Sequence, residues 1–348
     1  MQHWWRPELT GRAALLLPLS WLFGALAGLR RALYRARLLR VTHVPVPVIV
    51  VGNLTAGGSG KTPLVIALVH ALRAAGYTAG VISRGYGGAH DRDSSDASGG
   101  APLEITAGID PAQSGDEPLL IRRRTGAPVF VSRDRPRAAQ AVLTAYADVN
   151  VILSDDGLQH YALARDIEIA VFDERGVGNG RLLPAGPLRE PLARAASVTA
   201  IVRNVSEENI AKIGSHQGFP ASFTMQLAPL PCYQLVNTSE TCKANLLPAR
   251  SASGAFAAVA GIGDPARFFA TLRALGLRFS EHPFGDHHAF TRDDLATIDA
   301  DLIVMTEKDA LKCAAFNDTR IWVLPVEARI DPALINLILE KLRGRQAA

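Results

Sequence analysis

A glycine-rich segment at residues 55–62, TAGGSGKT, contains the residue types that bind phosphate groups. Glycines let successive backbone N–H groups point at one anion, a lysine neutralises phosphate oxygens, and the hydroxyl beside it binds Mg²⁺. The pattern departs from the usual loop because Thr55 stands where the first glycine is expected. A chance glycine-rich turn is the alternative at this point. The residues predicted to contact nucleotide phosphates are Thr55, Gly57, Gly58, Ser59, Gly60, Lys61 and Thr62, with Lys61 also catalytic and Thr62 also a metal ligand.

Two acidic residues, Asp155 and Asp156, directly follow the apolar run and serine at 151–154. A carboxylate at the end of a buried strand is the usual second Mg²⁺ ligand in proteins with a phosphate-binding loop. Gln159 and His160 come within the next turn, so several polar groups converge on one edge of the sheet. A helix N-cap is the structural alternative for the paired aspartates. Their position after a strand favours Asp155 as a metal ligand.

The loop needs a strand before it and a helix after it, and the sequence predicts both. Residues 46–51 form an apolar run, and Leu64, Leu68 and Leu72 repeat at helical spacing. Further strands are expected at 78–83, 127–132, 149–154, 167–172 and 197–202. This alternation predicts an α/β fold of the P-loop NTPase type, with a mostly parallel sheet and helices on both faces.

The chain is 348 residues long, which is enough for two domains. We expect an N-terminal helical segment at 1–40, a nucleotide-binding domain at 41–220, a two-stranded connection at 221–240 and a smaller α/β domain at 241–348. A last helix near 332–342 is in a position to pack back on the first domain. The polar loop at 92–102 is a candidate lid or a neutral insertion.

The N-terminal segment has the composition of a membrane-associating helix. Residues 13–29 carry no charge, and arginines follow at positions 30, 31, 35, 37 and 40. As a helix the run reaches about 26 Å, slightly less than the ~30 Å hydrocarbon core, and Pro18 lies inside it. Arginines after the run argue against a secretory signal peptide. We predict a helix lying in the membrane interface, with Trp4 and Trp5 beside it; a helix packed on the protein's own core is the alternative.

The overall composition excludes several classes of protein. Hydrophobic residues make up 48% of the chain and charged residues 20%, as in globular proteins rather than disordered ones. The net charge of +4 is too small to indicate a nucleic-acid partner. The three cysteines, Cys232, Cys242 and Cys313, fit a reducing compartment and predict neither a disulfide framework nor a cysteine metal site.

Several uncommon sequence words, in order from residue 51 to residue 312, resemble the tetraacyldisaccharide 4'-kinase family of lipid A biosynthesis. They are GNLTAGGSGKTP, SRGYGG, GDEP, SRDR, DDGLQH, GNGRLLPAGPLRE, GIGDPARFF, DHHAF and TEKDALK. Threonine in place of the first glycine belongs to that family's pattern. The resemblance implies ATP- and Mg²⁺-dependent phosphorylation of the 4'-hydroxyl of a tetraacyldisaccharide 1-phosphate. It also implies the cytoplasmic face of the bacterial inner membrane, with no nucleic acid and no obligate protein partner.

The resemblance further implies roles for individual residues. Asp116 of GDEP is the expected base, paired with His287 of DHHAF, although GDEP alone also predicts the start of a helix. Gln159 and Glu190 are further candidate metal ligands. Independently of the resemblance, Tyr86 and Arg84 follow the second predicted strand, on the ligand side of such a sheet, and are expected to contact ATP or the lipid head group. A glycine-rich turn that holds a packed tyrosine is the alternative for Tyr86. Arginine forks match the oxygens of a 1-phosphate. The expected substrate-binding residues are Arg84, Arg133, Asp156, His160, Arg181 and Arg189.

An alternative function is a P-loop switch or a metallochaperone-type NTPase that acts on a protein partner. The loop alone does not distinguish these classes. A guanine-binding protein is expected to carry Asn-Lys-x-Asp after a strand, whereas residues 306–309 read TEKD. The sequence also has no His- or Cys-rich metal tract. Both observations favour the kinase.

Overall fold

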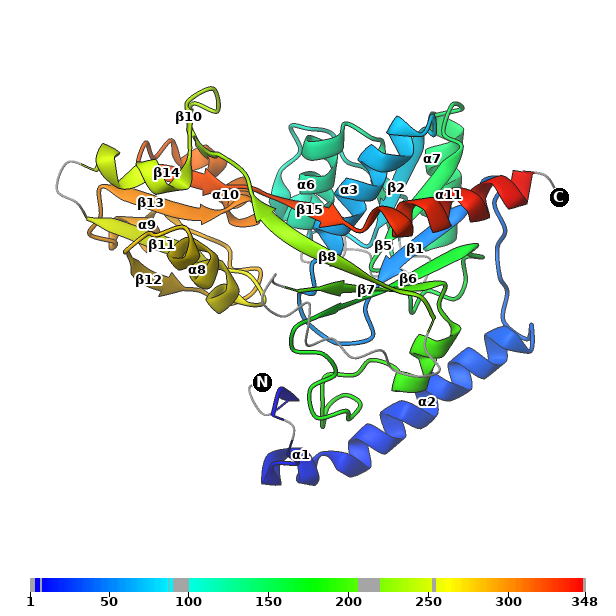
Figure 1. The fold of residues 1–348 in the computed structure, drawn as a ribbon. Helices are drawn as coiled ribbons and strands as arrows, with labels where there is room; N and C mark the ends of the chain where they lie inside the picture. Colours follow the sequence, from blue (N-terminus) through cyan, green and yellow to red (C-terminus); the bar gives the residue numbers. More distant parts are fainter. Residues whose placement is uncertain are drawn as a thin grey trace.

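The computed structural model describes residues 4–6, 8–86, 88–89, 100–205, 220–251 and 255–346. Within them the chain forms a larger and a smaller α/β unit, with an N-terminal helix extending below the larger one (Figure 1). The predicted loop at 92–102 lies outside the described residues except for 100–102. The fold class predicted from the sequence is confirmed.

The described strands of the larger unit form one sheet in the order β15-β8-β7-β6-β1-β5-β2-β4-β3. The neighbours from β8 to β4 run parallel, and β15 and β3 pair antiparallel at the two edges. Apolar runs such as VIVVG of β1 are buried on both faces, as parallel strands covered by helices must be. The strand bounds are β1 Val48–Gly52, β2 Ala79–Ser83, β3 Leu103–Glu104, β4 Val129–Val131, β5 Val151–Asp155, β6 Ile167–Asp173, β7 Ala200–Asn204, β8 Ser222–Pro229 and β15 Val326–Ile330.

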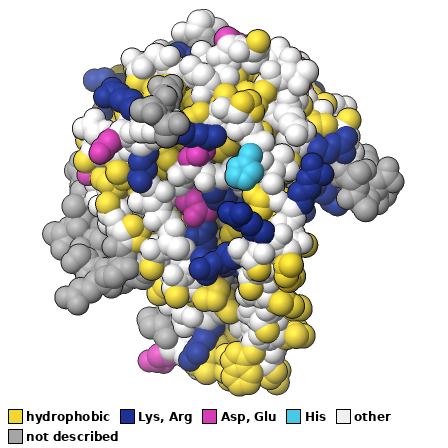
Figure 2. All heavy atoms as spheres, turned by 90° about the vertical axis from the view of Figure 1, so that its right-hand side faces the viewer, with side chains coloured by type: hydrophobic (Ala, Val, Ile, Leu, Met, Phe, Trp, Pro, Cys, Tyr) yellow, Lys and Arg dark blue, Asp and Glu magenta, His cyan; other side chains and the backbone are white. Residues whose placement is uncertain are grey.

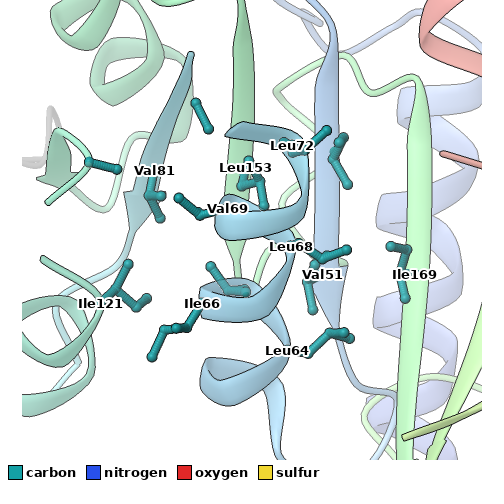
Figure 3. Close-up of a cluster of buried hydrophobic side chains, with 14 of the residues drawn as sticks. Val51, Leu64, Ile66, Leu68, Val69, Leu72, Val81, Ile121, Leu153 and Ile169 are labelled. Carbon is teal, nitrogen blue, oxygen red and sulfur yellow. The ribbon is translucent and has the colours of Figure 1, made fainter. Parts of the chain in front are cut away.

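Helices cover both faces of this sheet. On one face α3 lies over the central strands, and Figure 3 shows its Leu68 and Leu72 packed among Val51 and Leu153. A fully buried leucine of this kind contributes about 1.5–3 kcal/mol relative to an exposed one. Helices α6 and α11 join this face, while α7 and the 3₁₀-helix η2 cover the other. The bounds are α3 Lys61–Ala74, α5 Pro111–Ser114, α6 Asp116–Thr125, α7 Arg135–Ala145, η2 Leu192–Ser197 and α11 Pro332–Gln346.

The smaller unit is a sheet in the order β10-β9-β14-β13-β11-β12, with α8 and η4 on one face and α9 and α10 on the other. Its parallel part comprises β14, β13, β11 and β12. The bounds are β9 Cys232–Gln234, β10 Thr241–Cys242, η4 Ala244–Arg250, β11 Phe256–Ala260, α8 Pro265–Ala274, β12 Ser280–Pro283, α9 Arg292–Ala296, β13 Leu302–Thr306, α10 Glu307–Cys313, η5 Ala314–Phe316 and β14 Ile321–Leu324.

Two antiparallel strands, β8 and β15, connect the units. β8 belongs to the larger sheet and β9 to the smaller one, so the two strands expected around a turn at 221–236 lie in different sheets. The return strand is β15, which the sequence analysis missed and which pairs with β8 along its length. Helix α11 follows it and places Leu334, Ile338 and Leu342 in the core of the larger unit. The last helix therefore does pack back on the first domain.

The N-terminal segment forms α1 Gly11–Leu15 and α2 Leu17–Arg35, and Pro18 sits in the first turn of α2, where its missing N–H costs nothing. In the described structure Ser20 is the only buried residue of α2, so this helix does not pack into a core as the alternative proposed. Nine of the twelve large hydrophobic side chains exposed in the described residues lie between Leu9 and Leu39. Figure 2 shows them at the lower end of the molecule. Across the described residues, no helix combines the length and the apolar character needed to cross a membrane.

Candidate active site

The phosphate-binding loop lies between the end of β1 and the start of α3, at the carboxyl edge of the larger sheet. Lys61 and Thr62 open α3, and each is only 8% exposed. The loop faces a cleft of about 1990 Å³ that reaches from α2 past the loop to the smaller unit. Phe23 and Leu26 of α2 line one part of this cleft, and His287 and Lys308 line another.

Lys61 lies next to the two aspartates at the end of β5, Asp155 and Asp156. Its Nζ lies 3.7 Å from Oδ1 of Asp156, and Nη1 of Arg189 lies 3.1 Å from each oxygen of that carboxylate. Burial disfavours the charge on Asp156, but the attraction of Lys61 and Arg189 outweighs it and lowers its pKa below the usual range. The backbone of Asp156 is left-handed, with φ 48°, a strained conformation that often marks a functional position.

Asp155 has the surroundings of a metal ligand. The residue is 0% exposed, and neither carboxylate oxygen has a hydrogen-bond partner among the described residues. Burial, followed by repulsion from Glu117, raises its pKa to about 7 despite the charge of Lys61. A buried carboxylate without a partner is costly unless a cation joins it.

The donor set near Asp155 fits Mg²⁺. Among the described residues no group of three or more His, Cys, Asp or Glu is able to hold a metal ion. Mg²⁺ does not need one, because it binds through one or two protein oxygens together with substrate phosphates and water. The carboxylate of Asp155 and the hydroxyl of Thr62 are such oxygens, so the residues present fit this ion.

Gln159 and Glu190, the further candidate ligands, lie together beside the loop. The Nε2 of Gln159 donates to the carbonyl oxygen of Asn53 at 3.2 Å and to Oε2 of Glu190 at 3.3 Å. The hydroxyl of Tyr161 donates to Oε1 of Glu190, and Nε of Arg194 lies 3.9 Å from Oε2. Both oxygens of Glu190 are therefore already engaged by protein groups.

Asp116 and His287 come from different units and contact each other; His287 lines the cleft, and Asp116 is buried next to it. Asp116 is the first residue of α6, so it both begins a helix and contacts Nδ1 of His287 through Oδ2 at 3.2 Å. Nζ of Lys308 lies 3.8 Å from Oδ2, and Nζ of Lys312 lies 3.5 Å from it. Burial raises the pKa of Asp116, but the hydrogen bond from His287 and the charge of Lys308 outweigh burial and lower it to about 2. The same hydrogen bond raises the pKa of His287.

Some of the remaining predicted site residues line the cleft and others do not. Arg84, Tyr86 and His160 line the cleft, and the Tyr86 ring lies against His287 with centroids 5.5 Å apart. Burial and the charge of the nearby Arg135 lower the pKa of His160 to about 3, so its imidazole is neutral at neutral pH. Arg133 and Arg181 are exposed and do not line the cleft.

Sequence reasoning missed the two lysines that surround Asp116. Lys308 and Lys312 lie four residues apart on α10, and Lys308 also contacts Oε1 of Glu117 at 3.0 Å. Their position just after β13, at the carboxyl end of a parallel strand, was the available signal. Arg124 of α6 and Glu307 of α10 form a further ion pair at 2.7 Å between the same two helices.

One cleft is lined by a phosphate-binding loop, by Asp156 next to the acidic end of β5, and by an imidazole hydrogen-bonded to a buried carboxylate. This is the arrangement of a P-loop phosphotransferase. The family profile described as tetraacyldisaccharide-1-P 4'-kinase matches residues 12–343. This chain belongs to that family.

Relatives in several bacteria are similar along nearly their whole length. A tetraacyldisaccharide 4'-kinase of Dechloromonas aromatica is 47% identical, with 100% of this chain and 98% of that protein covered. One of Bordetella petrii is 49% identical over 97% of this chain and 93% of that protein. The crystal structure of LpxK from Aquifex aeolicus, described as an "apo" form in complex with ATP, is 28% identical with a TM-score of 0.75, covering 95% and 99% of the two chains.

Proposed function

We propose that this protein transfers the γ-phosphate of ATP to the 4'-hydroxyl of a tetraacyldisaccharide 1-phosphate, a step of lipid A biosynthesis. The observation that carries the proposal is the cleft lined by the phosphate-binding loop, by His287, which is hydrogen-bonded to the buried Asp116, and by apolar side chains of α2. A lipid acceptor needs all three, because its hydroxyl must meet the phosphate while its acyl chains stay out of water. A switch or chaperone NTPase needs only the first.

Different residues of the chain have different roles in the phosphate transfer. Lys61 and the N–H groups of the loop hold the phosphates and offset the charge that develops on their oxygens. Asp116 accepts the proton of the 4'-hydroxyl as the new oxygen–phosphorus bond forms and the bond to the ADP oxygen breaks. His287, hydrogen-bonded to Asp116, keeps that carboxylate aimed at the hydroxyl. A carboxylate with a pKa near 2 stays ionised at neutral pH and is ready to accept.

Thr62 and Asp155 are the proposed Mg²⁺ ligands, with Gln159 and Glu190 as further candidates. When bound, the ion neutralises part of the phosphate charge. Arg84 and Arg189, which line the cleft, are the proposed ligands of the acceptor's 1-phosphate, together with Asp156 and His160, which also line it. Tyr86 lies next to His287, which suits contact with the acceptor as well as with ATP. Arg133 and Arg181 stay predictions.

The N-terminal helices are proposed to rest on the cytoplasmic face of the inner membrane. Leu15 is 83% exposed, Trp21 67% and Leu22 56%, so the segment presents apolar surface to its surroundings. The arginines between positions 30 and 40 follow on the same segment and suit anionic head groups. An enzyme with an insoluble acceptor gains from lying on the surface that holds it.

The test of the function is transfer of labelled γ-phosphate from ATP to a tetraacyldisaccharide 1-phosphate in mixed micelles. We expect wild type to label the lipid, and Lys61→Ala and Asp116→Ala to lower the rate by about a thousandfold. Lys341→Ala and Asp299→Ala make the same changes at exposed positions outside the cleft and should match wild type. ATP hydrolysis without lipid labelling would refute the acceptor and favour the switch NTPase.

The membrane contact is tested by sedimentation with vesicles of anionic phospholipid. Replacing Leu15, Trp21 and Leu22 by glutamine should lower vesicle affinity about tenfold or more, because their apolar surface no longer leaves water. Leu246→Gln is the matched control, since Leu246 is 53% exposed in the smaller unit. Equal binding by the triple variant and the control would contradict the proposal.

A further inference from the structure

Three consecutive carbonyl oxygens of the phosphate-binding loop each accept a hydrogen bond from a side chain outside it. Nδ2 of Asn53 donates to the oxygen of Gly57 at 3.0 Å, Nη2 of Arg175 to that of Gly58 at 3.0 Å, and Nδ2 of Asn204 to that of Ser59 at 3.0 Å. We call Asn53, Arg175 and Asn204 the carbonyl clamp.

The clamp comes from three adjacent strand ends. Asn53 follows β1, Arg175 follows β6, and Asn204 ends β7, in a sheet whose order there is β7-β6-β1 (Figure 1). The side chains therefore approach the loop from the rigid edge of the sheet. Asn204 is 0% exposed and Arg175 is held by Asp173, with Nε 3.0 Å from Oδ2.

The orientation of the Asn204 amide is fixed by its second contact. Nη2 of Arg267, from α8 of the smaller unit, donates to Oδ1 of Asn204 at 2.6 Å. An arginine only donates, so Oδ1 must face it and Nδ2 must face the carbonyl of Ser59. A Cβ on Gly60 would lie 2.3 Å from that Nδ2, so the glycine here makes room for the clamp.

The clamp determines where the N–H groups of the loop point. In a planar trans peptide the C=O of one residue and the N–H of the next point in opposite directions. Holding the oxygens of residues 57, 58 and 59 toward the sheet edge turns the N–H groups of Gly58, Ser59 and Gly60 away from it. These three residues line the cleft. The loop takes backbone conformations that glycine permits and other residues disfavour, with φ of 103° at Gly57 and 90° at Gly60.

We propose that Asn53, Arg175 and Asn204 are positioning residues that preset the loop's N–H groups for the phosphates of ATP. The proposal rests on the proposed function only in that the loop binds a nucleotide. Two members are also tied to outlying segments, Asn204 to Arg267 and Arg175 to the ring of Trp5, whose centroid lies 4.2 Å from the guanidinium carbon. Preset donors bind an anion without reorganisation at the moment of binding.

The experiment is calorimetric titration of the full chain with Mg²⁺ and a non-hydrolysable ATP analogue. Asn204→Asp keeps the size but sets an acceptor against the Ser59 oxygen, and should weaken binding about a hundredfold. Arg175→Gln should weaken it about tenfold, and Arg175→Lys, which keeps one donor, should recover most of that loss. Asn150→Asp is the control, because Asn150 is exposed and contacts Thr78 at the opposite edge of the sheet.

If the clamp residues had a purely structural role, replacing them would lower the melting temperature and change KM for both substrates. The clamp instead predicts a raised KM for ATP, an unchanged KM for the lipid and a melting temperature within a few degrees of wild type. If Asn204→Asp does not fold, Arg175→Gln decides alone, since the Arg175 side chain is 22% exposed. Analogue binding equal to that of Asn150→Asp would overturn the clamp.

The two proposals fail in different ways. If wild type binds the analogue but labels no lipid, the acceptor is wrong, while the comparison of clamp variants by calorimetry still stands. If wild type binds no analogue at all, the nucleotide site and the clamp are both overturned.

Discussion

Asp155 lies at the end of β5 with no hydrogen-bond partner among the described residues, whereas Asp116 lies within 4 Å of one imidazole and two ammonium groups. Both carboxylates are buried, yet the pKa of the first is raised to about 7 and that of the second is lowered to about 2. Burial acts in the same direction on both, so the neighbouring charges make the difference.

The contrast separates two ways of using a buried carboxylate. Asp155 is destabilised in the protein alone, and that cost is recovered when a cation binds beside it. Asp116 is already compensated by His287, Lys308 and Lys312, so it stays charged without a ligand. We call the part of the site around the phosphate-binding loop and Asp155 the donor side, and the part around Asp116 and His287 the acceptor side. We infer that the charge of the donor side is balanced only when a cation binds. The charge of the acceptor side is balanced by the docking of α10 on α6.

The largest expected effects come from neutralising each carboxylate in turn. Asp155→Asn and Asp116→Asn should each lower lipid phosphorylation about a thousandfold. Their melting temperatures in Mg²⁺-free buffer should differ: removing the uncompensated charge of Asp155 should not lower it, whereas Asp116→Asn leaves two lysines without their partner. The second variant should lose about 2 kcal/mol of unfolding free energy.

Asp299→Asn, at an exposed position, serves as the control for both measurements. The comparison fails if Asp155→Asn melts as far below wild type as Asp116→Asn does, because Asp155 would then be stabilised by partners of its own.

The donor side could be predicted because its parts are close in sequence. Strand β1, the glycine-rich loop and α3 follow one another within 48–74, and Asp155 ends a strand of obvious apolar pattern. The acceptor side could not be predicted by such reasoning. Glu117 and Lys308 are 191 residues apart, and their contact exists only because α10 of the smaller unit docks on α6. Asp116 and His287 were found only through the family resemblance.

The carbonyl clamp was missed for a related reason. Strand β1 pairs with β6 in the sheet, but β2 to β5 lie between these two strands in the chain, so Asn53 is far in sequence from Arg175 and Asn204. An asparagine after a strand has no distinctive local pattern. Strand β15 was missed although its residues alternate between half-buried and exposed, because the chain enters it directly from β14 through Pro325.

A smaller effect is expected from removing one cation beside Asp116. Lys312→Met should raise the pKa of Asp116 from about 2 toward its ordinary value and lower the unfolding free energy at neutral pH by about 1 kcal/mol. Because the folded pKa of Asp116 is depressed, its stabilisation is complete above about pH 4 and is lost as the pH falls toward 2. Denaturant unfolding of wild type and variant at pH 7, 4, 3 and 2 measures the difference.

Lys341→Met makes the same change on the exposed side of α11 and should follow wild type at every pH. The gap between wild type and Lys312→Met should narrow from pH 4 to pH 2, as Asp116 becomes protonated in both proteins. A gap that stays constant over this range would mean that Lys312 stabilises the protein by packing rather than through the charge of Asp116.

The smallest expected effect concerns Glu190, whose surroundings are intermediate between those of the two aspartates. It is buried like Asp155 but accepts hydrogen bonds from the neutral groups of Tyr161 and Gln159, and Arg194 is its one ion-pair partner among the described residues. Tyr161→Phe removes one of these bonds and leaves the carboxylate less firmly oriented. The Mg²⁺ concentration for half-maximal lipid phosphorylation should change about threefold, with KM for the lipid unaltered.

Tyr34→Phe is the matched control, because the Tyr34 ring packs on Tyr161 with centroids 5.9 Å apart and no hydrogen bond to Glu190. An equal change in both variants would mean that the aromatic pair acts by packing α2 against the site. A change in Tyr161→Phe alone would tie Glu190 to the metal side of the cleft. The need of each carboxylate for Mg²⁺ then falls as more protein groups contact it. Asp155 needs the ion most and Asp116 needs it least.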